Sequence, residues 1–250
     1  MEMECVDGAT VANENAAAWW DALASARGNA MIRRRGWFWV PGSLRSGLRI
    51  MILRPDLGPD ALAEITELAG SWPRTSRITV EDPHNLVDLT GIGLTPNSLP
   101  VMLREPGPVP GTPRLAASVV TDPAEIALVE RVVVDGFPLR QFQQPYTVGE
   151  ALPLALTDHP GVAFYLARRD GEPVGACMTM YDGVAGGIYW VGTLPEHRSQ
   201  GVGRAVMTAA LHHLGNVPAT LTATAAGQPL YESMGFRTVA EATWWWHTTD

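Results

Sequence analysis

The fold of this chain is decided by one short stretch, Arg198-Ser199-Gln200-Gly201-Val202-Gly203-Arg204, which joins two apolar patterns of different period. The run before it, residues 188–194, is mostly apolar and ends at Pro195, which is typical of a buried strand. The run after it, residues 201–214, repeats apolar residues at helical spacing. The sequence therefore predicts a strand, a tight turn and a helix in that order.

A turn of this kind is suited to hold an anion. The first backbone N–H groups of a helix have no partner inside the helix, and they point outward with the positive end of the helix dipole. Gly201 and Gly203 carry no Cβ, so the backbone there can approach an anion closely and adopt unusual dihedral angles without strain. We therefore expect residues 199–204 to bind a phosphate-sized anion.

A second motif follows at residues 228–236, which read Gln-Pro-Leu-Tyr-Glu-Ser-Met-Gly-Phe. The spacing Arg-x-x-Gly-x-Gly in the first motif resembles the pyrophosphate loop of the GCN5-related N-acetyltransferases (GNAT family), and the second motif is similar to the Leu-Tyr-Glu-x-x-Gly-Phe ending of that family. The resemblance covers residues 114–250, about half of the chain. It implies a protein that binds acetyl-coenzyme A (acetyl-CoA).

A run rich in proline and glycine at residues 106–113 divides the chain. Such a run continues neither a helix nor a central strand, so it predicts a semi-rigid linker between a domain at residues 1–105 and a domain at residues 114–250. In the second domain, Asp-Gly at residues 170–171 predicts a hairpin. The expected order there is strand 114–120, helix 124–134, strands 162–168, 174–181 and 188–194, helix 201–214, strand 219–224, helix 229–234 and strand 236–247.

The first domain contains no Arg-x-x-Gly-x-Gly loop, but its elements alternate in a similar way. The expected elements are a helix at 16–26, strands within 30–40 and at 48–53, a helix at 59–69, and strands at 77–80 and 99–103. Tandem GNAT proteins carry a degenerate copy of the fold as an N-terminal half, and this order is compatible with such a copy. The resemblance thus implies an α+β fold of two GNAT-like halves, with a mixed, mostly antiparallel sheet flanked by helices. The catalytic half would be residues 114–250.

The resemblance also implies a donor site where the strand at 188–194 meets the helix at 201–214. The pyrophosphate would bind the N–H groups of residues 199–204. The pantetheine arm would lie beside the end of the strand, where an N–H group polarises the thioester carbonyl and Gly192 suits a local bulge. Thr224 stands where many relatives have an asparagine that contacts the cofactor. The expected cofactor-binding residues are Val191, Gly192, Thr193, Arg198, Ser199, Gln200, Gly201, Val202, Gly203, Arg204 and Thr224.

Acyl transfer from a thioester to an amine needs a proton for the departing thiolate. Tyr231 aligns with the tyrosine that donates this proton in the family, and a phenol with a pKa of about 10 stays protonated at neutral pH. Tyr231 is therefore the expected catalytic residue. The alternative is a buried tyrosine that only packs the short helix.

The general base is left open. Many relatives use a glutamate on the central strand or on the next one. The residues at these places here are Tyr189, Trp190, Ala219 and Thr220. Asp182, His159 or a chain of water molecules are the alternatives.

The amino-acid composition limits the reaction types, partners and metals expected for this chain. All 18 basic residues are arginine, and the lack of lysine excludes Schiff-base catalysis and a P-loop. The net charge of −8 disfavours nucleic-acid binding and fits a small substrate that bears an amine. The two cysteines, Cys5 and Cys177, indicate neither a disulfide framework nor a zinc site, and His212-His213 lack the spacing of a metal pair, so no metal is expected.

No apolar stretch of the sequence is long enough to cross a bilayer, and the N-terminus lacks the pattern of a secretory signal. We therefore expect a cytoplasmic protein with no membrane partner. The leading function is an N-acyltransferase that moves an acetyl or other acyl group from CoA to a small-molecule amine. Two alternatives are an acyltransferase whose donor is a carrier-protein thioester or an aminoacyl-tRNA, and a non-catalytic regulator that binds acyl-CoA. The oligomeric state stays open.

Overall fold

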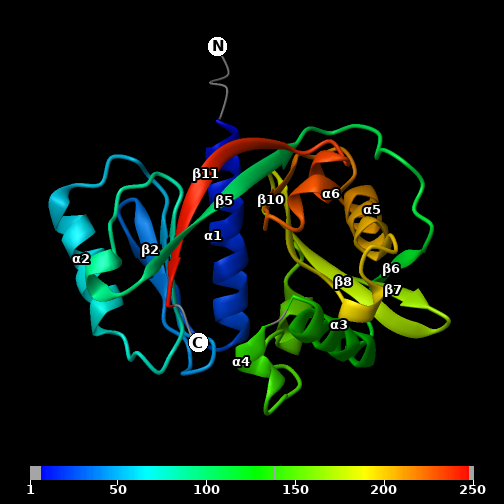
Figure 1. Cartoon of the computed structure of the whole chain (residues 1–250), viewed down its shortest axis with the longest axis horizontal. Coiled ribbons are helices and arrows are strands. Elements are labelled where there is room, and N and C mark those ends of the chain that lie inside the picture. The colour runs from blue at the N-terminus through cyan, green and yellow to red at the C-terminus, as the bar shows by residue number, and fades with distance from the viewer. Residues whose placement is uncertain (1–6, 138, 248–250) are drawn as a thin grey trace.

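The computed structural model describes residues 7–137 and 139–247. Cys5 lies outside these residues. The described chain forms one continuous sheet in the order β1-β2-β3-β4-β11-β5-β10-β9-β8-β7-β6, with helices on both faces (Figure 1). The strands are β1 (Ile32–Arg34), β2 (Trp37–Val40), β3 (Leu48–Ile52), β4 (Ile78–Asp82), β5 (Thr95–Arg104), β6 (Ala117–Val120), β7 (Val162–Arg169), β8 (Glu172–Tyr181), β9 (Gly186–Thr193), β10 (Ala219–Thr222) and β11 (Arg237–Trp246).

Most neighbouring strands are antiparallel. The parallel pairs are β3 with β4 and β9 with β10. The α-helices are α1 (Gly8–Ala26), α2 (Pro59–Ser71), α3 (Pro123–Gly136), α4 (Arg140–Gln143), α5 (Val202–Leu214) and α6 (Gln228–Glu232), and short 3-10 turns lie at η1 (Thr90–Ile92), η2 (Leu154–Asp158) and η3 (Pro195–His197). The predicted α+β class and the mixed, mostly antiparallel sheet are confirmed.

Two cores flank the second half of the sheet. One core joins α1 and α3 to alternate residues of β7 and β8, such as Phe164 and Met178. The other joins α5 and α6 to the residues between them, such as Tyr165 and Cys177. Because successive side chains of a strand point to opposite faces, α1 and α3 cover one face of the sheet and α5 covers the other. A third core packs α2 on β3 and β4.

The first helix is longer than the sequence pattern predicts, since it begins at Gly8 rather than at residue 16. Its first two turns contain asparagines, which are weak helix formers. Asn15 is fully buried, and its side-chain amide donates hydrogen bonds to Met180 O (3.0 Å) and Ala185 O (2.9 Å). Tertiary contacts to the β8–β9 connection therefore stabilise a helix that propensity alone does not predict.

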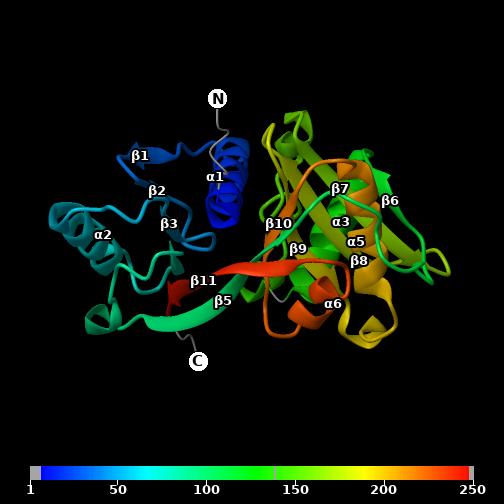
Figure 2. The same cartoon turned by 90° about the horizontal axis from the view of Figure 1, so that it is seen from above.

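The two halves of the chain exchange strands. β11, the last strand, lies between β4 and β5 of the first half, and it pairs with β5 from Arg237↔Leu103 to Trp246↔Thr95. β5 in turn pairs with β10 of the second half. Figures 1 and 2 show β5 and β11 side by side, running from one lobe to the other. The sheet is therefore continuous across the proposed domain boundary.

The residues that connect β5 to β6 are fixed to the second half by two arginines. The Arg104 side chain, 6% exposed, donates to Met234 O at 2.9 Å, to Gly107 O at 2.8 Å and to Pro108 O at 2.7 Å. Arg204 donates to Pro110 O at 3.2 Å. The linker thus lies against the ends of α5 and α6.

The strand exchange predicts how the chain behaves when the linker is cut. A specific protease site inserted between Gly111 and Thr112 should be cleaved, because both residues are exposed. The two fragments should still elute together on native size-exclusion chromatography, because β11 stays paired with β4 and β5. A denaturing gel verifies the cut. Separate elution of the fragments under native conditions would contradict the exchanged topology.

Candidate functional site

Two parallel strands part in the middle of the sheet. β9 and β10 pair only at Ala219↔Gly186 and Thr220↔Gly187. Beyond this point β10 continues its pairing with β5, while β9 pairs with β8 alone. The edge of β9 from residue 188 to residue 193 is therefore available to a ligand that pairs with it as a strand would.

A bulge lies on β9 in this open segment. Its register against β8 shifts between Ala176 and Met178, so that Trp190 and Val191 oppose one residue. Trp190 has a φ of 49°, a left-handed conformation that is uncommon for a bulky side chain. Its ring packs edge-on against Trp19 and Trp20, at centroid distances of 5.6 and 6.3 Å. The strain is therefore offset by aromatic packing from α1.

The expected bulge is present on this strand, and Gly192 borders it rather than forming it, since Gly192 pairs with Ala176. A Cβ on Gly192 would lie 3.5 Å from both Phe137 N and Val132 O. These are ordinary contacts, whereas a Cβ on Gly136 would lie 2.9 Å from Thr193 N, so Gly136 allows the end of α3 to pack closely on β9. Val191 and Thr193, the other predicted residues of this strand, are half-buried at its open end.

The predicted anion loop connects β9 to α5 through left-handed residues. Ser199 has a φ of 58° and Gly201 a φ of 83°, and α5 begins at Val202. Among the described residues, no group accepts a hydrogen bond from the backbone N–H groups of residues 199–204. The first turn of α5 contains no acidic side chain. The loop therefore presents a series of free N–H donors at a helix N-terminus, as an anion site requires.

Gly203 brings the two sequence motifs together. A Cβ at this position would lie 3.0 Å from Leu230 Cδ2 and 3.9 Å from Thr193 Oγ1. The start of α5, the end of β9 and the side of α6 thus meet at Gly203. A larger residue here would crowd the Leu230 side chain and the anion loop.

The longer side chains of the loop form hydrogen bonds with neighbouring segments of the chain. Arg198 donates to Gly136 O at 3.1 Å, and Gln200 pairs with Arg169 and donates to Glu196 O at 2.9 Å. Arg204 also donates to Ser233 Oγ at 2.5 Å. These contacts engage the side chains of Arg198, Gln200 and Arg204, while the backbone N–H groups of the loop have no acceptor among the described residues.

Thr224 begins the turn that leads into α6. Its Oγ1 accepts a hydrogen bond from Gly227 N at 3.3 Å, and its carbonyl oxygen accepts from Gly227 N and Gln228 N at 2.9 and 3.0 Å. The residue is exposed. A role for Thr224 in cofactor binding stays a prediction, and its observed contacts stabilise the turn before α6.

Tyr231 lies on α6 in the core shared with α5, where it is 8% exposed. Its ring packs against Phe236 at 6.1 Å and leaves room at residue 227 only for glycine, since a Cβ there would lie 2.8 Å from the ring. Burial raises the pKa of the Tyr231 phenol above its ordinary value, so the hydroxyl stays protonated at neutral pH. A protonated phenol can donate to a leaving group.

The two alternatives for the general base, Asp182 and His159, are engaged in turns. Asp182 Oδ1 accepts from Val184 N and Ala185 N, both at 2.8 Å, and His159 Nδ1 accepts from Gly161 N at 3.1 Å. Both line an open groove along α1 and the β8–β9 turn. Neither lines the cavity at the place where β9 and β10 part.

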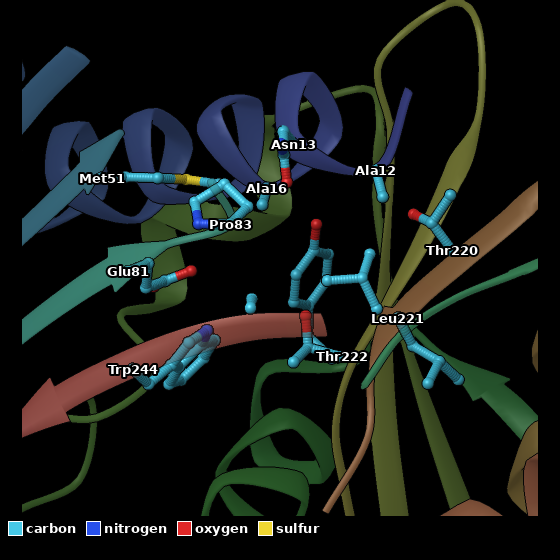
Figure 3. A pocket seen from close by; sticks show the side chains of 13 residues that line it. Ala12, Asn13, Ala16, Met51, Glu81, Pro83, Thr220, Leu221, Thr222 and Trp244 are labelled. Carbon is cyan, nitrogen blue, oxygen red and sulfur yellow. The ribbon is translucent and has the colours of Figure 1, made fainter. Parts of the chain in front are cut away.

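That cavity contains groups that the sequence analysis missed. It lies between α1 and the centre of the sheet, and its lining includes Glu81 of β4 and Asn13 of α1 together with Tyr189 of β9 (Figure 3). Two of these residues come from the first half, which we expected only to support the second. One sequence feature could have pointed to Glu81: it is a glutamate within a strand that is buried at every position. A carboxylate is rarely placed in such a strand without a partner.

Within the described ranges, no three His, Cys, Asp or Glu residues are grouped closely enough to hold a metal ion. None of the helices in this part of the chain has the length and apolar character needed to cross a membrane.

Comparisons with known proteins agree with this geometry. Residues 160–238 match the family model described as an acetyltransferase (GNAT) domain. A mycothiol acetyltransferase from Streptomyces griseus subsp. griseus is 40% identical over 84 residues, which are 30% of this chain and 27% of that relative. The match thus spans about a quarter of the length of that relative.

Two solved structures are similar over nearly the whole chain. A GCN5-related N-acetyltransferase from Kribbella flavida has a TM-score of 0.65 and 22% identity, with 96% of each chain covered. A tandem GNAT protein from the clavulanic acid biosynthesis pathway has a TM-score of 0.56 and 16% identity, with 98% of this chain and 99% of that chain covered. Residues 160–238 therefore form a GNAT acetyltransferase domain, and the fold of the chain is similar to that of GNAT proteins, one of them a tandem GNAT protein, over both halves.

The loop geometry predicts the effect of a β-branched residue at position 203. Gly203→Val should weaken CoA binding by more than about tenfold, because displacing the loop removes charge-assisted hydrogen bonds worth about 1.5–3 kcal/mol each. Calorimetry with CoA measures the affinity. Gly70→Val is the matched control, since Gly70 is an exposed helical glycine in α2 and should leave the affinity unchanged. Unchanged CoA affinity in a folded Gly203→Val protein would remove the loop from the donor site.

Proposed function

We propose that this protein is an N-acetyltransferase that transfers the acetyl group of acetyl-CoA to the amine of a small molecule. The observation that carries the proposal is the set of free N–H groups at residues 199–204, placed at the end of a strand whose edge is open. The N–H groups suit a pyrophosphate, and the open edge suits the amide-containing pantetheine arm. Free CoA fits this loop better than a carrier-borne pantetheine, which lacks the pyrophosphate.

In this proposal the parted strands position the thioester. The edge of β9 from residue 188 to residue 193 would bind the pantetheine amides, and the bulge at Trp190 would aim a backbone N–H at the thioester carbonyl. An N–H placed where negative charge develops stabilises the tetrahedral intermediate. Tyr231, protonated and buried beside the loop, would supply the proton that the thiolate needs.

The acceptor is proposed to be a small-molecule amine. The mycothiol acetyltransferase is, by its name, a relative that acts in small-molecule chemistry. The net charge of −8 favours the approach of a cationic amine. An acyltransferase that uses a carrier protein or an aminoacyl-tRNA as donor, and a regulator that binds acyl-CoA without catalysis, are the competing functions.

A thiol-release assay separates these functions. The protein, acetyl-CoA and a panel of primary amines that includes glucosamine, tryptamine, ethanolamine and hydroxylamine are mixed, and free CoA is measured over the rate without enzyme. Release that depends on the amine supports the enzyme. Tight CoA binding with no release for any amine would support the regulator and contradict the proposed function.

The proposed role of Tyr231 predicts the effect of removing its hydroxyl. Tyr231→Phe keeps the ring that packs on Phe236, so the fold and the CoA affinity should be retained. Loss of a positioned acid should lower kcat by about 10²-fold or more. Tyr181→Phe is the control, because the Tyr181 hydroxyl donates only to Gly183 O in an exposed turn. A folded Tyr231→Phe protein with the kcat of the wild type would leave Tyr231 a packing residue.

A further inference from the structure

The cavity on the α1-covered face of the sheet lies where β9 and β10 part (Figure 3). Its volume of about 20 Å³ has room for one water molecule or one amino group. Its polar lining consists of Asn13, Glu81, Tyr189, Thr220 and Thr222. Thr222 is exposed and the others are buried or half-buried, so the cavity is polar inside and closed on most sides.

Glu81 is the single carboxylate among the described residues that line this cavity. It lies in β4 with only 4% of its surface exposed, and it forms an ion pair with Arg49. The Arg49 guanidinium lies over the Trp20 ring at 3.6 Å, and Arg49 is not among the residues that line the cavity. Burial raises the pKa of the Glu81 carboxyl, against the opposing effect of Arg49. A carboxylate with a raised pKa is a better proton acceptor.

This ion pair is a weak source of stability. Removing two charges from water costs several kcal/mol per ion, and replacing a buried pair by apolar residues of similar volume is often neutral or stabilising. The residues paired with Glu81 on the two neighbouring strands, Met51 and Trp244, are apolar. The presence of a carboxylate at this place therefore calls for a role other than packing.

A second polar group points into the same cavity without a partner. Asn13 is 4% exposed, and among the described residues none accepts a hydrogen bond from its Nδ2. Figure 3 shows Asn13 extending from α1 and Glu81 extending from β4 toward the same space. A buried amide without a partner is costly, so a water molecule or a ligand group that accepts from Asn13 would be favoured there. The Tyr189 hydroxyl donates a hydrogen bond to Asn15 Oδ1 at 2.6 Å. This bond holds the Tyr189 side chain in place in the lining of the cavity.

We propose that Glu81, from the first half of the chain, is the general base of acetyl transfer, and that Asn13 positions the reacting amine or one bridging water beside it. This inference rests on the proposed function. The cavity lies on the face of β9 and β10 opposite to α5, so the thioester would enter the parted strands from the side of the loop and the amine from the side of α1. The first half then completes the active site rather than only supporting it.

The amine nitrogen forms a bond to the acetyl carbon while Glu81, directly or through the one water, takes a proton from the nitrogen. The C–S bond then breaks, and Tyr231 gives its proton to the thiolate. The products are the acetamide, CoA thiol, a protonated Glu81 and a tyrosinate, and proton exchange with solvent restores both residues before the next turnover.

The test compares Glu81→Gln and Glu81→Asp with the wild type in the thiol-release assay. Hydroxylamine is the first acceptor, because it is small enough for the cavity and is largely unprotonated at neutral pH. The fastest amine of the panel is the second. Glu81→Gln should lower kcat by about 10²-fold while CoA affinity is unchanged, and Glu81→Asp should recover part of the loss.

The pH profile separates a base from a structural residue. Glu81 accepts a proton only when it is ionised, so kcat/KM of the wild type should fall as the pH drops through its pKa. With rates referred to the concentration of unprotonated hydroxylamine, the folded Glu81→Gln protein should lack this acidic limb. Glu125→Gln is the matched control, since Glu125 is also paired with an arginine, Arg168, but lies at the start of α3 away from the cavity. Its rate and pH profile should equal those of the wild type.

Because Glu81→Gln leaves Arg49 unpaired, the double variant Arg49→Met/Glu81→Gln removes both charges and is measured as well. A thermal melt and CoA calorimetry establish that each variant is folded. If either folded variant retains the turnover and the acidic limb of the wild type, the inference is wrong and the proposed function stands. If the wild type itself transfers no acetyl group to any amine, the proposed function is wrong and the inference is wrong with it.

Discussion

The site depends on one feature of backbone pairing: β10 is bonded to β9 at only two positions and to β5 along its whole length. A strand has two edges, and β10 uses one of them for β5, so its direction follows β5 and β11 instead of β9. The edge of β9 is left open as a consequence. The free N–H groups of residues 199–204 follow the end of that open edge, since the short turn η3 joins β9 to the loop.

The same pairing ties the site to the first half of the chain. β5 belongs to the first half by sequence, yet it is the strand that holds β10 away from β9. α1 covers the opposite face, where Trp19 stacks on Tyr189 at 4.9 Å and contacts the strained Trp190. The first half has no anion loop of its own, because the connection between β3 and α2 lacks the Arg-x-x-Gly-x-Gly spacing. In the inference above, it contributes Glu81 and Asn13 to the active site instead.

The local parts of this arrangement could be predicted from sequence. The order of strands and helices and the anion loop follow from apolar period and from glycine at positions such as Gly201, because these depend on residues close in the chain. The exchange of β11 into the first half could not be predicted, because strand register is set by pairing between distant segments. The bulge was expected at Gly192 and lies at Trp190, because packing by two tryptophans of α1 overrides the conformational preference of a single residue. The sequence also did not reveal Glu81 as a site residue. Its place in the cavity depends on how β4, α1 and β9 pack together, and these segments are far apart in the chain.

The central claim is that the β9–α5 loop and the open edge of β9 form the donor site, and hydrogen exchange with and without CoA tests it most directly. Amide groups without an acceptor exchange quickly and slow down when a ligand accepts their hydrogen bonds. Saturating CoA should protect residues 199–204 most strongly and residues 188–193 next. Protection confined to residues 7–105, or no protection of residues 199–204 when CoA is bound, would contradict it.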